Sequence, residues 1–95
     1  MYYLGVDVGG TKTAVAISDE RGQILSYKIG KGANYQACGA EKSFFRLNST
    51  IIETCHQIGI TKEDIDFSFL GIAGVDHEHD IVVIRRILEK LELSH

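Results

Sequence analysis

The chain has 95 residues, which is enough for one small domain. Apolar residues make up 44% of the sequence and charged residues 24%, proportions that indicate a folded globular chain and exclude wholesale disorder. A net charge of −3 without a basic stripe argues against nucleic acid as the main partner.

Neither the apolar runs nor the cysteines point to export or to a membrane. No apolar run approaches the roughly 18 residues that a membrane span requires. The start of the chain lacks the basic segment and apolar core of a signal peptide. Two cysteines, Cys38 and Cys55, are too few for a disulfide framework and are expected to be reduced thiols. We therefore predict a cytoplasmic protein that does not associate with a membrane.

The first 29 residues carry the period-2 alternation of β-strands. The pattern predicts strands over Tyr2–Val8, Thr13–Ser18 and Gln23–Ile29. Asp19–Gly22 is expected to form a turn in which Gly22 takes a positive φ. Because the connections are short, the three strands should form an antiparallel meander.

Residues 30–34 are expected to be a loop, and a helical period follows over Glu41–Ile58. Gly59 is expected to end this helix at C′. The apolar stripe of the helix, which should pack on the sheet, consists of Phe44, Leu47, Ile51, Cys55 and Ile58, widened by Phe45 and Ile52.

Thr61–Asp64 resembles a short capped turn, and the near-continuous apolar run Phe67–Ile72 predicts a strand that is buried on both faces. A second helix is predicted over Ile81–Leu91. Its apolar side should consist of Ile81, Ile84, Leu88 and Leu91. The resulting order is β-β-β-α-β-α, in which the first helix lets the fourth strand return parallel to the first.

The stretch from Asp7 to Thr13, Asp-Val-Gly-Gly-Thr-Lys-Thr, contains the groups that a phosphate and its magnesium ion require. Gly9 and Gly10 permit positive φ and leave backbone N–H groups uncovered. Asp7 ends the preceding strand with a carboxylate. The purely structural alternative is a tight hairpin that uses glycine for its geometry. The stretch is neither a Walker A loop nor a Gly-x-Gly-x-x-Gly dinucleotide motif.

This stretch resembles the first phosphate-binding motif of the sugar kinase, Hsp70 and actin superfamily, in the form used by the BadF/BadG/BcrA/BcrD ATPase family. Leu70–Asp76 resembles the Gly-Leu-Ala-Gly signature of the same family. It departs from the repressor/open-reading-frame/kinase class of sugar kinases, which has a proline there, whereas this chain has none.

The resemblance implies an α/β fold, a ribonuclease H-like (actin-like ATPase) lobe that is incomplete. Residues 1–95 would be the N-terminal part of the first lobe, without its fifth strand, its third helix and the second lobe. The cofactors implied are ATP and Mg²⁺. Asp7 would hold the magnesium ion, and the phosphates would lie against Gly9, Gly10, Thr11, Lys12 and Thr13.

The resemblance also places a sugar near Asn34, since an asparagine of this loop lies at the sugar site of N-acetylglucosamine kinase-like proteins. Tyr35 could stack on the sugar or cover the following helix, and Asn34 could simply form a turn. Gly74 would let substrate approach the backbone. Asp76 could contact substrate or cap the next helix. The residues His77 to Asp80 could suggest a metal site, but a polar helix start explains them better.

We therefore expect the N-terminal part of an ATP-dependent sugar kinase that takes an aminosugar or hexose. In the resembled kinases the catalytic aspartate follows the fifth strand, so no catalytic residue is expected in this chain, and the chain alone should be inactive. Two alternatives remain open: an ATPase that energises electron transfer in a partner dehydratase, and a non-catalytic ligand-binding module. The apolar edge of the fourth strand predicts a homodimer or an edge-paired oligomer.

Overall fold

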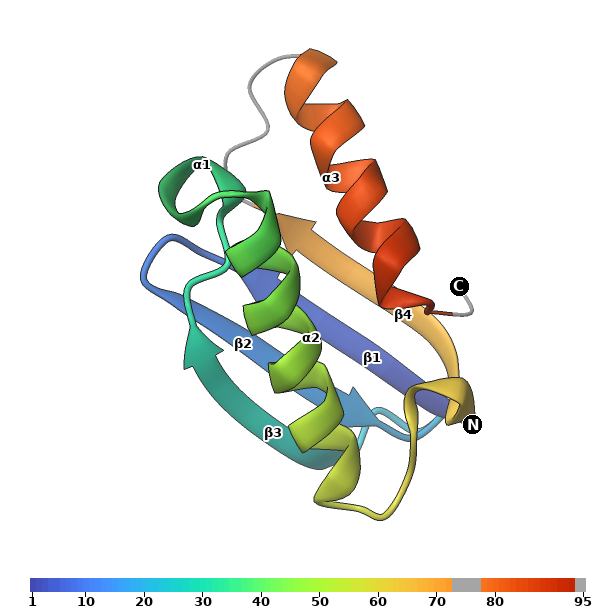
Figure 1. The fold of residues 1–95 in the computed structure, drawn as a ribbon. Coiled ribbons are helices and arrows are strands. Elements are labelled where there is room, and N and C mark those ends of the chain that lie inside the picture. The colour runs from blue at the N-terminus through green and yellow to red at the C-terminus, as the bar shows by residue number, and fades with distance from the viewer. Residues whose placement is uncertain (73–77, 94–95) are drawn as a thin grey trace.

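A single four-stranded sheet, seen in Figure 1, organises the molecule. The computed structural model describes residues 1–72 and 78–93. The strand order is β3-β2-β1-β4. β2 pairs antiparallel with β1 and β3, whereas β4 pairs parallel with β1, so the predicted meander and parallel fourth strand are both confirmed. The strands are β1 (Tyr2–Val8), β2 (Lys12–Ser18), β3 (Ile24–Lys31) and β4 (Ile65–Ile72).

The predicted turn between β2 and β3 is confirmed. Gly22 has a φ of 81°, a conformation that glycine adopts without a steric penalty. Asp19 stabilises the turn, because its Oδ1 accepts hydrogen bonds from the backbone nitrogens of Arg21 at 2.9 Å and Gln23 at 3.0 Å. The turn between β2 and β3 is therefore stabilised by hydrogen bonds between residues that are close in sequence.

Among the described residues, helices cover only one face of this sheet. Figure 1 shows α2 and α3 lying on the same side of it. In the described residues the helices are α1 (Tyr35–Cys38), α2 (Ala40–His56), the 3₁₀ turn η1 (Lys62–Asp64) and α3 (Glu78–Leu91). Helix α1 was not predicted, because one turn is too short to show an apolar period. It is capped by Asn34 and separated from α2 by Gly39, whose φ is 86°.

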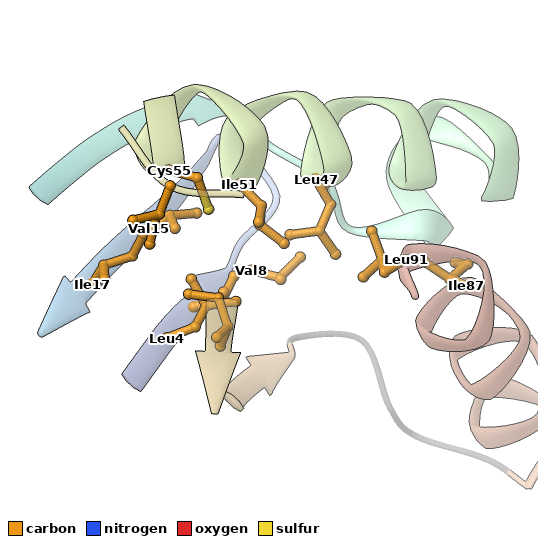
Figure 2. Close-up of a cluster of buried hydrophobic side chains, with 13 residues drawn as sticks. Leu4, Val8, Val15, Ile17, Leu47, Ile51, Cys55, Ile87 and Leu91 are labelled. Carbon is orange, nitrogen blue, oxygen red and sulfur yellow. The ribbon is translucent and has the colours of Figure 1, made fainter. Parts of the chain in front are cut away.

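The core lies between the sheet and the two longer helices (Figure 2). Leu4 and Val8 of β1 and Val15 and Ile17 of β2 project from the same face because side chains alternate along a strand. They meet Leu47, Ile51 and Cys55 of α2, and Ile87 and Leu91 of α3 belong to the same buried cluster.

Two predicted core residues are wrong. Phe45, expected to widen the apolar stripe of α2, is 71% exposed, while Ile52 is half-buried. Ile81 of α3 is 47% exposed, because the buried side of that helix runs instead through Ile84, Ile87 and Leu91. The buried side of α2 also includes the polar residues Ser43, Thr50 and Thr54, so apolar residues alone did not locate the buried face.

The prediction that β4 is buried on both faces is also wrong. Its outward side chains Phe67 and Phe69 are 47% and 70% exposed, while Leu70 and Ile72 pack against the core. The reason is that neither α2 nor α3 lies on that face of the sheet (Figure 1). An apolar run of this length can be read as doubly buried only when both faces are covered.

The segment between α2 and β4 agrees with the sequence. Gly59 has a φ of 72° just beyond the end of α2. The backbone nitrogen of Thr61 donates to Asp64 Oδ2 at 2.9 Å, which caps η1 as expected. In residues 1–72 and 78–93, no helix has the length and apolar character of a membrane span.

Candidate phosphate and sugar site

The β1–β2 connection, residues 9–11, is a tight turn closed on itself. The Gly9 nitrogen donates to the Lys12 carbonyl at 3.0 Å. Neither Gly9 nor Gly10 has a positive φ, so this part of the expectation for the two glycines is wrong. For Gly9 the reason is close packing instead, since a Cβ there would lie 2.9 Å from the Lys12 carbonyl oxygen.

The loop after β3 packs directly onto this turn. Gly32 donates its N–H to the Thr11 carbonyl at 3.2 Å, and the Gly9 carbonyl accepts from Ala33 at 3.1 Å and Asn34 at 3.3 Å. A Cβ on Gly32 would lie 2.1 Å from the Gly10 carbonyl oxygen, so only glycine fits there. The expected phosphate turn and the expected sugar loop are therefore one connected unit.

Several donors of this unit are available to a ligand. Gly10, Thr11 and Lys12 are exposed. In the part of the chain that the structure describes, the backbone nitrogens of Gly10 and Thr11 donate no hydrogen bond. Two adjacent free N–H groups with a nearby ammonium suit an anion such as phosphate.

Asp7 lies on the face of the sheet that the helices leave open. It is exposed, whereas its neighbours Val6 and Val8 are buried on the helix side. Its cross-strand partners, Ala14 on β2 and Gly71 on β4, are small and leave room around the carboxylate. Such a lone carboxylate fits Mg²⁺, which keeps several waters and takes its remaining oxygens from substrate. Among the described residues, no three His, Cys, Asp or Glu side chains converge as a metal cluster.

Thr13 lies apart from the other residues of the motif. It belongs to β2 and points to the helix side, where it is 0% exposed, while Thr11 remains exposed in the turn. Within the described chain its Oγ1 has no hydrogen-bond partner. The alternation of β2 has already begun at Lys12, which explains why two threonines of one motif have different environments.

Asn34 is half-buried, and its side chain is only partly used by the fold. Its Oδ1 accepts from the Gln36 nitrogen at 3.0 Å and thereby caps α1. No hydrogen bond of its Nδ2 occurs within the described residues. Both readings of the sequence are therefore compatible here, because the oxygen forms the turn and the amide nitrogen remains available to a ligand.

Tyr35 covers the core and points its hydroxyl at a carboxylate. Its ring packs against the core cluster, and its hydroxyl donates to Asp80 Oδ1 in α3. Gln36 Nε2 donates to the same oxygen at 3.0 Å. Asp80 is only 4% exposed. Of the two roles expected for Tyr35, the geometry favours covering the helices.

Sequence reasoning missed the role of Asp80 by grouping it with a polar helix start. A signal was present, because Asp80 precedes Ile84, Ile87 and Leu91 at the spacings of the buried stripe of α3. The expected substrate residues Gly74 and Asp76, and His77 of the disfavoured metal site, lie outside the described residues.

The titratable groups with shifted pKa values lie away from this unit. Burial raises the pKa of the Cys55 thiol, which sits in the core. At the opposite end of the sheet, hydrogen bonding by its own backbone N–H and the nearby N-terminal ammonium lower the pKa of Glu20. Neither group contributes to a ligand site.

A mixed α/β sheet whose first strand ends in a glycine turn with free N–H groups is the arrangement expected of an ATPase with the actin-like fold. The chain belongs to the BadF/BadG/BcrA/BcrD ATPase family, whose sequence profile matches residues 4–84. The predicted fold class is confirmed by a solved structure that resembles the chain, a sugar kinase of the actin-like ATPase fold.

Two relatives specify the similarity further. The chain is 28% identical to the N-acetyl-D-glucosamine kinase of Dictyostelium discoideum over 94% of its own length. It superimposes with a TM-score of 0.67 and 26% identity on a provisionally named N-acetylglucosamine kinase from Chromobacterium violaceum, over 96% of the chain. The chain spans only 30% of the length of each relative.

Proposed function

We propose that this chain is the N-terminal, Mg-ATP-binding part of a sugar kinase that phosphorylates a hydroxyl of N-acetylglucosamine or a related sugar. The observation that carries the proposal is the junction of residues 9–11 with residues 32–34. It joins the backbone of Asn34 to the turn that carries the free N–H groups of Gly10 and Thr11, because Asn34 donates its backbone N–H to the Gly9 carbonyl.

In this proposal Asp7 holds the magnesium ion, and the turn from Gly9 to Lys12 binds the phosphates. The ATP supplies the phosphoryl group that is transferred. Asn34 holds the sugar through its amide nitrogen.

The base that orients the sugar hydroxyl belongs to a part of the kinase outside these 95 residues, so we expect no turnover by the chain alone. The kinase would act in the cytoplasm, which agrees with the two free cysteines.

The protein expressed from its complete coding sequence tests this proposal. With Mg²⁺ it should phosphorylate N-acetylglucosamine at the expense of ATP. Asp7→Asn should lower kcat about 100-fold, because the metal would lose its carboxylate partner. Glu63→Gln, which removes an exposed acid from η1, is the matched control and should leave kcat unchanged.

An enzyme that binds ATP but phosphorylates no aminosugar or hexose would contradict the proposal. ATP hydrolysis that requires a redox partner would instead favour the energy-coupling ATPase. Ligand binding with neither activity would favour the non-catalytic module.

A further inference from the structure

Asp80 is a buried carboxylate that the proposed chemistry does not use. It lies in the first turn of α3, is 4% exposed, and accepts hydrogen bonds through Oδ1 from Tyr35 Oη and Gln36 Nε2. A carboxylate withdrawn from water is strongly unfavourable unless such donors are present. The two donors come from α1, more than forty positions earlier in the chain. Asp80 therefore joins α3 to the segment that follows the sugar loop.

Helix α1 requires such an anchor to keep its position. It contains four residues, a single turn, which is far shorter than a helix that persists by itself. Gly39, with a φ of 86°, separates it from α2, so the helical path of α2 does not extend into it. Its position depends on the start of α2, where Ser43 donates to the Gly39 and Ala33 carbonyls, and on the Tyr35 ring and the bonds to Asp80.

The position of α1 in turn determines the orientation of Asn34. The Asn34 side chain is bonded to the backbone nitrogen of Gln36, the residue whose own side chain reaches Asp80. On its other side, Asn34 donates its backbone N–H to Gly9. Asn34 is thus held between the phosphate turn and, through its two neighbours, Asp80.

The phosphate turn does not depend on the same contacts. The Gly9–Lys12 hydrogen bond closes it, and the pairing of β1 with β2 continues from it. Loss of the Asp80 contacts should therefore loosen the sugar end of the unit while the phosphate end stays in place.

We propose that Asp80 is a positioning residue for the sugar: its buried carboxylate holds Tyr35 and Gln36, and thereby fixes the Asn34 amide beside the phosphate turn. This inference rests on the proposed kinase function. A residue that only stabilised the start of α3 would instead change the KM values for sugar and ATP alike, or change neither.

The test compares Asp80→Ala, Tyr35→Phe and the double variant in the protein made from the complete coding sequence. We expect each single variant to raise the KM for N-acetylglucosamine about tenfold, the effect of one charge-assisted hydrogen bond. The KM for ATP should stay within about twofold, since the phosphate turn keeps its own bonds. The double variant should raise the KM for N-acetylglucosamine no further than Asp80→Ala does alone, because removal of the carboxylate already breaks the hydrogen bond to Tyr35.

Glu89→Gln is the matched control, since Glu89 is an exposed acid on the same helix. It should change neither KM. Equal losses for sugar and ATP in Asp80→Ala, additive effects in the double variant, or no change at all would overturn the inference.

Amide hydrogen exchange separates this inference from the proposed function, because it needs no activity. In Asp80→Ala, exchange should quicken in peptides covering residues 33–38 and stay unchanged in the β1–β2 hairpin. If the unsubstituted protein phosphorylates no sugar, the proposed function fails while faster exchange still supports the Asp80 anchor. Unchanged exchange at residues 33–38 overturns the anchor whatever the activity.

Discussion

Thr11 and Thr13 show how a displacement of two residues changes what a hydroxyl can do. Thr11 lies in the exposed turn, whereas Thr13 lies in the core with an Oγ1 that has no partner among the described residues. A buried hydroxyl without a hydrogen bond lowers stability, because it has lost water and gained nothing in return. The hydroxyl of Thr11 can therefore bind a ligand, whereas the hydroxyl of Thr13 lowers the stability of the folded protein.

Thr13→Val should increase the free energy of unfolding by about 1 kcal/mol, since valine has the same shape without the unpaired hydroxyl. Urea denaturation followed by circular dichroism measures the change. The reciprocal control is Val15→Thr at the next inward position of β2, which is also 0% exposed and should cost roughly 1–3 kcal/mol. A clear loss of stability in Thr13→Val would mean that the hydroxyl has a partner in the folded protein.

At the scale of the elements, Lys62 ties three of them together. Its Nζ lies 2.8 Å from Asn48 Oδ1 in α2 and 2.6 Å from the Leu91 carbonyl at the end of α3. The last carbonyls of a helix have no partner within the helix. A positive charge beside them also interacts favourably with the negative end of the helix macrodipole. The short turn η1 thus caps α3 as well as leading into β4.

Lys62→Met should lower the free energy of unfolding by about 1–2 kcal/mol, because the Leu91 carbonyl and the Asn48 amide oxygen lose a charged donor. Thermal denaturation provides the measurement. Lys42→Met, at an exposed position of α2, is the matched control and should be neutral within about 0.5 kcal/mol. Equal melting temperatures for the two variants would contradict a capping role.

The elements were predictable where the signal was local. The alternation of β1 and β2, the Asp19–Gly22 turn and the period of α2 each depend on residues close in sequence, and the structure confirms them. The exposure of Phe45 and Phe69 was not predictable in this way. It depends on which faces the other elements cover, and a one-dimensional pattern does not contain that information.

The candidate site was likewise predictable only where its features depend on residues close in sequence. Its donors could be identified from the turn motif, because the sequence of a turn determines which backbone groups it presents. The joining of residues 32–34 to residues 9–11 could not, since it arises from the tertiary approach of two loops. The Asp80 link also joins α1 to α3, two elements far apart in the sequence, and only the spacing of the buried residues of α3 indicated it.

At the scale of the whole molecule, the sheet leaves one face without helices (Figure 1). Its outward residues include Tyr27, Ile29, Phe67 and Phe69, all at least 47% exposed. Between them on the central strands lie the small residues Gly5, Ala14 and Ala16. An apolar sheet face of this kind is a surface for association, and β4 is an edge strand in the described sheet.

We therefore expect the isolated 95-residue chain to self-associate as its concentration rises. Phe69→Thr should weaken this association, because it removes a 70% exposed ring while keeping a good strand former. Phe45→Thr is the control, since Phe45 is equally exposed but on a helix. Light scattering over a concentration series measures the effect. A monodisperse monomer at high concentration, or equal effects of the two variants, would contradict the expectation.

The parallel pairing of β1 with β4 has a further consequence during synthesis of the chain on the ribosome. Tyr3 pairs with Phe67, 64 positions later, whereas β2 follows β1 directly. At about 5–20 residues per second, a ribosome needs roughly 3–13 s to deliver β4 after β1. During that interval one edge of β1 has no native partner, even if the meander has already formed. Nascent chains on neighbouring ribosomes are therefore exposed to mispairing at the strand that carries Asp7.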